Sequence, residues 1–194
     1  VLHPEQAVIG YDPGPGNMLM DAWCEQHTGQ GFDKNARFAL QGNTDAALLT
    51  QLLAEPYLTM SAPKSTGREL FNIDWLHHQL TEHNTSTQDV QRTLCEYSAK
   101  TIASEVEKFT YGQQPQLLVC GGGARNPLLM QRLAELLPQW QVATTDDKGV
   151  DGDYMEAMAF AWLAQRHIDG LPSNLPEVTG ASRPASLGVL YPKN

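Results

Sequence analysis

The sequence has no cluster of basic residues, and this absence excludes the usual kind of nucleic-acid surface. Its 13 Lys and Arg residues are scattered through 194 positions without forming a run, and 22 Asp and Glu residues give a net charge of −9. A nucleic-acid surface needs clustered positive charge to neutralise the phosphate backbone. We therefore expect no nucleic-acid partner, and we expect small anionic ligands to be held by backbone N–H groups and local positive charges.

Long apolar runs and regular cysteine spacing are also missing. No apolar stretch approaches the roughly 20 residues that a membrane-spanning helix requires, and we expect no signal peptide. The three cysteines, Cys24, Cys95 and Cys120, are odd in number and form no CxxC pair, which is typical of reduced thiols. We therefore expect a cytoplasmic protein without a membrane partner.

The six histidines show no HExxH or other metal-binding spacing, so we expect no metal held by protein side chains. What the sequence does contain is enough apolar material for a core, since 41% of its residues are hydrophobic. The chain lacks an initiator Met, and its first apolar segment begins only a few residues in. We expect it to be a piece of a longer protein.

Apolar runs alternate with helical patterns, which predicts an α/β fold. The clearest unit is a strand in "QLLVC", a glycine turn in "GGGARN", a helix starting at Pro127 with Asn126 as its N-cap, and a strand in "WQVATT". Further strands are expected in "AVIGY" and, as an edge strand, in "SLGVLYP". The other expected helices cover residues 18–28 with Asn17 as N-cap, 44–54 capped by Asn43 or Thr44, 72–80, 87–109 and 154–168.

The first candidate site is "DPGPGN", where a predicted strand ends and a helix begins. Gly14 and Gly16 leave the backbone bare there, so the N–H groups of the helix N-terminus can point at an anion. A carboxylate at Asp12 is useful beside a phosphate if Mg²⁺ lies between them, or if it must take a proton from a nucleophile. The alternative is that Asp12 only caps a turn, and the residues themselves favour neither.

The second candidate site is the triple glycine after the "QLLVC" strand. Three glycines let the backbone approach a ligand closely and adopt positive φ. Gly121 and Gly123 also match the first two positions of a dinucleotide fingerprint, with Asp146 where the ribose-binding acid is expected. Asn126 stands where the third glycine should be. A nucleotide site of another kind is therefore favoured over the NAD site of a Rossmann-type oxidoreductase.

Two weaker candidates carry charged side chains. Glu156 begins an otherwise apolar helix, where an unpaired buried carboxylate is costly, although the helix dipole alone favours an acid in the first turn. In "PKSTGRE", Lys64 and Arg68 could bind an anion, but Thr66 with Glu69 also matches a capping box, the commoner explanation.

Five segments, in order, resemble the C-terminal half of bacterial anhydro-N-acetylmuramic acid kinases. They are "GYDPGPGNMLMDAW", "PKSTGREL", "LLVCGGGARNPLLMQRLAELLP", "TTDDKGVDGDYMEAMAFAWLA" and "NLPEVTGA". The resemblance spans residues 1–194 and implies one ribonuclease-H-like C-terminal lobe of the actin, heat-shock chaperone and sugar kinase superfamily. Such a lobe has a mixed sheet flanked by helices. The N-terminal lobe would be absent from this chain. A non-catalytic partner subunit of that superfamily is a further alternative.

The resemblance also implies a reaction. ATP and Mg²⁺ would serve the opening and 6-phosphorylation of 1,6-anhydro-N-acetylmuramic acid in peptidoglycan recycling, by an enzyme that is a homodimer at full length. The implied roles are Asp12 as catalytic base, Gly14, Gly16 and Asn17 at phosphate, Gly121, Gly122, Gly123 and Asn126 at the nucleotide, and Glu156 at the sugar. One departure is Pro13, where the family is expected to have Thr; it lacks an N–H donor and a hydroxyl.

Overall fold

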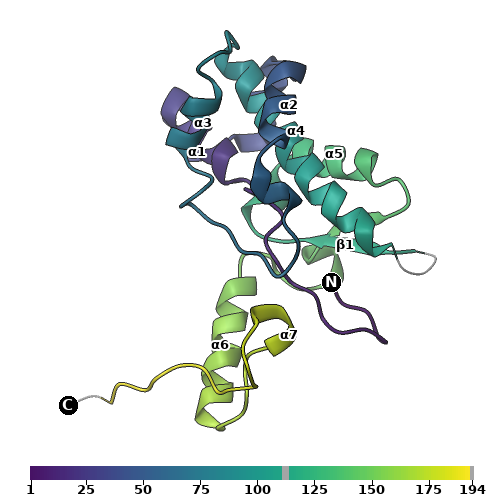
Figure 1. Ribbon diagram of the computed structural model, residues 1–194, viewed down its shortest axis with the longest axis vertical. Helices are drawn as coiled ribbons and strands as arrows, with labels where there is room; N and C mark the ends of the chain where they lie inside the picture. Colours follow the sequence, from purple (N-terminus) through teal and green to yellow (C-terminus); the bar gives the residue numbers. More distant parts are fainter. Residues whose placement is uncertain (111–113, 193–194) are drawn as a thin grey trace.

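The longest helix, α4 (Thr87–Val106), is the element on which α1, α2 and α5 pack (Figure 1). The computed structural model describes residues 1–110 and 114–192. The side chains of Val90, Leu94 and Tyr97 are fully buried and recur at the spacing of one helix face. The long helix expected from the sequence is therefore confirmed, and only its last turn differs, because η4 (Glu107–Phe109) is a 3₁₀ helix.

The remaining α-helices are α1 (Met18–Thr28), α2 (Ala46–Leu53), α3 (Ile73–Gln79), α5 (Pro127–Leu136), α6 (Met155–Ile168) and α7 (Pro176–Thr179). Short 3₁₀ helices are η1 (Lys34–Ala36), η2 (Ala39–Gln41), η3 (Pro56–Thr59), η5 (Gly122–Arg125) and η6 (Asp146–Lys148). The cap expected for α2 is wrong. Asp45, rather than Asn43 or Thr44, accepts hydrogen bonds from the N–H groups of Ala47 and Leu48.

The predicted βαβ unit is confirmed. Strands β1 (Gln116–Val119) and β2 (Gln141–Thr144) are parallel, with Leu117 opposite Val142, and α5 connects them. The side chain of Asn126 accepts hydrogen bonds from the first-turn N–H groups of α5, as an N-cap does. Because both strands run the same way, the glycine turn after β1 and the residues after β2 meet at one edge of the sheet.

The expected mixed sheet is wrong: the described residues contain a two-stranded parallel sheet, and neither 7–11 nor 186–192 is a strand. A strand needs a neighbour that supplies a ladder of hydrogen bonds. Residues 7–11 find other partners instead. The N–H of Ile9 donates to the carbonyl of Val1, and the N–H of Asp12 donates to the carbonyl of Lys64.

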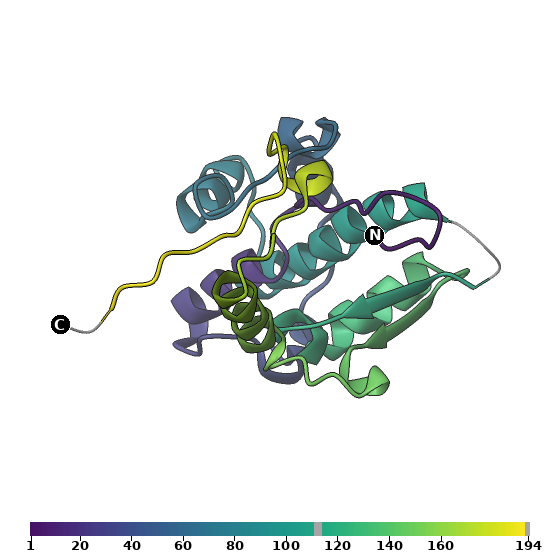
Figure 2. The same cartoon turned by 90° about the horizontal axis from the view of Figure 1, so that it is seen from below.

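Helices α6 and α7 lie below the bundle formed by α1–α5 in Figure 1, and the chain after α7 extends away from them (Figure 2). No side chain of α6 is buried within the described structure, although the helix is rich in apolar residues. Phe160 is 67% exposed and Trp162 is 53% exposed. None of the helices described here is long and apolar enough to cross a membrane.

Candidate functional site

The loop that contains Asp12 lies along one face of α4. Ser98 Oγ donates a hydrogen bond of 2.6 Å to the carbonyl oxygen of Gly16, and Tyr11 donates one of 2.7 Å to Glu105 Oε2. Between these contacts, a Cβ added to Gly14 would lie 3.1 Å from Thr101 Oγ1. Gly14 therefore lets the loop approach the helix closely, a packing role that the sequence did not suggest.

Four hydrogen bonds connect Asp12 to residues 57–66. Its carboxylate oxygen Oδ2 accepts hydrogen bonds from Ser65 Oγ at 2.7 Å and from the N–H of Thr66 at 3.0 Å. Its N–H donates to the carbonyl of Lys64 at 3.3 Å, and its carbonyl accepts a hydrogen bond from Tyr57 Oη at 2.8 Å. Among the described residues, Oδ1 accepts no hydrogen bond, so this oxygen is the one left open to a ligand or water.

Lys64 is buried and paired with Glu105, so its side chain is not open to an external anion, the weaker of the two roles considered for this segment. Its Nζ lies 3.4 Å from Glu105 Oε1 and donates to the carbonyl of Leu58 at 3.2 Å. Burial raises the pKa of Glu105, but hydrogen bonds from Lys108 and Tyr11 and the charge of Lys64 outweigh it, so the pKa lies below its usual value. Burial, followed by the bond to Glu105, raises the pKa of Tyr11.

The capping box expected at Thr66 and Glu69 is wrong, because residues 62–70 form no helix. The N–H of Thr66 is used to hold Asp12, and the next helix, α3, is capped by Asn72. The "PKSTGRE" segment thus supports the first candidate site.

Asn17 connects this loop to the glycine turn. It stands at the N-cap position of α1, but its side chain does not cap that helix; Nδ2 donates to Asp21 Oδ2 at 2.6 Å instead. A Cβ on Gly122 would lie 3.4 Å from Asn17 Nδ2, and one on Gly123 would lie 3.7 Å from Asn17 Oδ1. The two glycine-rich loops that were predicted separately are therefore neighbours.

Gly16 and Gly121 have the open space and positive φ expected of a ligand loop. Gly16 has φ of 57° and Gly121 has φ of 75°, and a Cβ at either position would meet nothing within 4 Å. Gly122 has no positive φ and begins η5. The conformational freedom of glycine is therefore needed at the first position of the triple, not at the second.

A residue that the sequence did not single out lies beside this turn. Thr145, directly after β2, is 8% exposed, and within the described part of the chain its Oγ1 has no hydrogen-bond partner. A Cβ on Gly152 would come within 3.3 Å of Thr145 Oγ1 and 3.5 Å of Gly121 N. The sequence could have indicated Thr145 by its position, because residues that follow two adjacent parallel strands lie at the same edge of the sheet.

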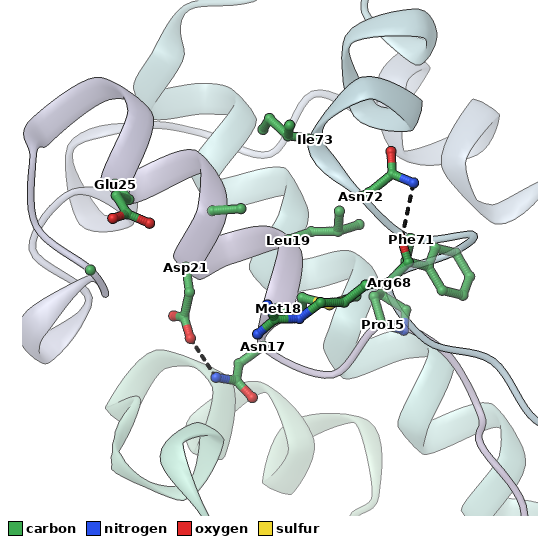
Figure 3. A pocket seen from close by; sticks show the side chains of 12 residues that line it. Pro15, Asn17, Met18, Leu19, Asp21, Glu25, Arg68, Phe71, Asn72 and Ile73 are labelled. Carbon is green, nitrogen blue, oxygen red and sulfur yellow. Dashed lines mark hydrogen bonds between the residues drawn. The ribbon is translucent and has the colours of Figure 1, made fainter.

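Two cavities meet around Asn17. The larger, of about 540 Å³, runs along the start of α1, and the side chain of Arg68 extends over it toward that end of the helix (Figure 3). The smaller, of about 190 Å³, is lined by Asn17, Gly122, Arg125 and Asn126 among others. Burial and the charge of Asp33 raise the pKa of Asp21, which lines both cavities, although its bond from Asn17 opposes them.

The structure does not bring all candidate residues to one place. Asp12 lines a separate shallow groove with Tyr11, Ser65 and Val178, and Glu156 is exposed on α6 and lines neither of the two cavities. Glu156 therefore has the first-turn position favoured by the helix dipole without the burial that would make its charge costly. Within residues 1–110 and 114–192, no cluster of three His, Cys, Asp or Glu side chains could hold a metal ion.

Comparison with known proteins gives one consistent family. A profile of the family described as "Anhydro-N-acetylmuramic acid kinase" matches residues 1–193. The chain is similar to proteins of that name from Vibrio parahaemolyticus, with 79% identity over 100% of the chain and 52% of the relative, and from Vibrio cholerae, with 64% identity over 98% and 52%. For Pasteurella multocida the identity is 54%, over 99% and 51%.

The chain thus spans about half the length of the curated relatives it matches. These matches give no support to the NAD-dependent oxidoreductase or to the non-catalytic partner subunit.

Proposed function

Because the chain belongs to the anhydro-N-acetylmuramic acid kinase family, we propose that it forms one lobe of an enzyme that opens and phosphorylates 1,6-anhydro-N-acetylmuramic acid with ATP. We propose further that it corresponds to the C-terminal half, with a ribonuclease-H-like core. Supporting this are the order of the five motifs, the parallel β1–α5–β2 unit, and the adjacency of the two glycine loops through Asn17. The other lobe, and a homodimer of the full-length enzyme, belong to the same proposal.

The edge of the sheet has the features that a nucleotide needs. Gly121 leaves open space in front of the backbone, and the Thr145 hydroxyl beside it is buried and lacks a partner among the described residues, which is unusual for a structural threonine. ATP, when bound, supplies the phosphoryl group. Mg²⁺, when bound, would be held mainly by the substrate phosphates and water.

Asp12 supplies the proton acceptor. The reaction requires a water to attack the anomeric carbon as the bond from that carbon to O6 breaks. O6 then takes the γ-phosphoryl group of ATP, whose bond to the bridging oxygen breaks as ADP leaves. Asp12 Oδ1 accepts the proton of that water, while Oδ2 stays bonded to Ser65 and Thr66. This fixed carboxylate with one open oxygen is the observation that carries the proposal.

The test of the reaction uses the full-length enzyme with ATP, Mg²⁺ and the anhydro sugar in water enriched in oxygen-18. The expected product is the 6-phosphate, with the label at the anomeric carbon and none in the phosphate group when it is sampled before anomeric exchange. Label at O6 would mean that water attacks carbon 6 rather than the anomeric carbon, and labelled inorganic phosphate without labelled sugar would mean that water attacks phosphorus; either result would make the proposed role of Asp12 wrong. Failure to form any 6-phosphate would reject the sugar kinase itself.

Gly121→Val in the full-length enzyme is expected to raise the KM for ATP by about tenfold or more, and to change the KM for the sugar little. A β-branched residue at a φ of 75° is strained by about 1–3 kcal/mol, and its side chain would enter the space in front of the turn. The measurement is steady-state kinetics with each substrate varied. Gly122→Val is expected to act more weakly, since its φ is not positive and its side chain would first meet Asn17.

The matched control is Gly170→Val, because Gly170 also has a positive φ, of 64°, and open space, but lies in the turn after α6. It is expected to lower the melting temperature without raising the KM for ATP. If Gly121→Val, like Gly170→Val, lowers the melting temperature and does not raise the KM for ATP more than the KM for the sugar, Gly121 serves folding alone.

A further inference from the structure

The segment from Tyr57 to Thr66, here called the 57–66 segment, makes contacts that a simple connecting loop does not need. It supplies all four hydrogen bonds described for Asp12, two to the carboxylate and two to the backbone. A residue that only turns the chain has no requirement for a fixed carboxylate. We propose that Ser65 and Lys64 are positioning residues that hold the Asp12 carboxylate in its reacting orientation; this inference rests on the proposed function of Asp12.

Ser65 acts on the carboxylate directly. Its side chain is exposed, so burial does not explain why its hydroxyl points at Asp12, and the 2.7 Å bond falls on the same oxygen that accepts the N–H of Thr66. Two donors on Oδ2 restrict the rotation of the carboxyl group and leave Oδ1 without a hydrogen bond among the described residues. Hydrogen bonds to a charged acceptor are stronger than neutral ones, which suits this task.

Lys64 acts on the segment that carries Ser65. Its ammonium group is buried, with 1% of the side chain exposed, and it binds Glu105 of α4 and the carbonyl of Leu58. The same group lies 5.6 Å from the ring centre of Tyr11 and 5.1 Å from that of Tyr57, which is cation–π geometry. Tyr11 directly precedes Asp12, and Tyr57 donates a hydrogen bond to the carbonyl of Asp12. Lys64 therefore links two residues that contact Asp12 to Glu105 of α4.

A buried ion pair contributes little net stability when it is compared with apolar replacements, because desolvating two charges offsets their attraction. The Lys64–Glu105 pair is therefore better explained by the geometry that it imposes than by the stability that it adds. Charged groups facing Lys64 and Glu105 include Lys108, which bonds Glu105 Oε2 at 2.7 Å.

The deciding experiment is Ser65→Ala in the full-length enzyme, with Ser61→Ala as the matched control. Ser61 is exposed in the same stretch of chain and is not among the residues that bond Asp12. Ser65→Ala is expected to lower kcat by about 10- to 100-fold and to leave both KM values and the melting temperature nearly unchanged, because misplacement of a reacting group by about 1 Å has effects of this size. Ser65→Thr, which keeps the hydroxyl, is expected to restore most of kcat.

A second measurement separates positioning from any other role. In an Asp12→Asn background the base is already lost, so adding Ser65→Ala is expected to lower the residual kcat no further. Lys64→Met tests the anchor, with the same kinetic pattern expected if the variant folds; if it does not fold, Ser65→Ala decides alone. A kcat for Ser65→Ala equal to that of Ser61→Ala would overturn the inference, and so would an equal loss in the two backgrounds. Neither result bears on Asp12 as base, which Asp12→Asn tests separately.

Discussion

Asp12→Asn in the full-length enzyme is expected to lower kcat by about 10²–10⁴ while ATP binding is retained. Asparagine has the same shape as aspartate, and its side-chain oxygen can still accept the hydrogen bonds that Ser65 and Thr66 donate to Oδ2. Its other group is an amide NH₂, which cannot take a proton from water. The variant therefore removes the base and leaves the geometry of the loop in place.

Two measurements on the purified variant check this expectation. Steady-state formation of the 6-phosphate gives kcat, and calorimetric titration with a non-hydrolysable ATP analogue gives the affinity for nucleotide. Ser61→Ala is a useful comparison here too, because Ser61 is exposed and is not among the residues that bond Asp12. Turnover by Asp12→Asn at the wild-type rate would show that Asp12 only shapes the turn.

The 194-residue chain alone is expected to show no measurable phosphorylation of the anhydro sugar, even with ATP and Mg²⁺ in excess. Phosphoryl transfer depends on positioning and on charge stabilisation from more than one side of the phosphate. This chain offers the loop of residues 12–17 and the glycine turn, while Glu156 and the apolar side chains of α6 face solvent. Closure that excludes water cannot occur without the other lobe.

The assay is formation of the 6-phosphate by purified chain, followed by addition of the separately produced other half. Some activity is expected to return on mixing. The variant Asp12→Asn, mixed in the same way, is the control, because it should bind the other half without restoring turnover. Robust activity of the chain by itself would mean that a single lobe contains the whole site and that the proposed two-lobe arrangement is wrong.

The parts of the fold that could be predicted are those fixed by local chemistry. Asn126 followed by Pro127 determines the start of α5 within one turn, and the apolar spacing of α4 requires no information from elsewhere in the chain. The N-cap residue of α2 could not be predicted from the local sequence alone. Residues 43–45 are all good caps, and contacts distant in sequence favour Asp45, whose carboxylate binds Thr85 and whose N–H donates to Thr93.

The sheet was overpredicted because an apolar run does not reveal whether a partner strand exists. Residues 7–11 have the composition of a buried strand, but their hydrogen bonds go to Val1 and, at Asp12, to Lys64. For the candidate site, the glycine loops were visible in the sequence, whereas the partners of Asp12 were not. Ser65 is separated from Asp12 by 53 positions, and only the fold brings the two together.

The way in which α4 holds the loop of residues 11–16 restricts which changes of chain length this region can accept. Ser98, Thr101 and Glu105 contact Gly16, Gly14 and Tyr11 in turn, so the loop runs antiparallel to a helix whose residues are spaced by about 1.5 Å. Inserting or deleting one residue between Tyr11 and Gly16 would break at least one of these contacts or move Asp12 away from Ser65. We expect insertions and deletions in homologous chains to be excluded from this stretch, while length-preserving substitutions at positions other than Asp12, Gly14 and Gly16 are better tolerated.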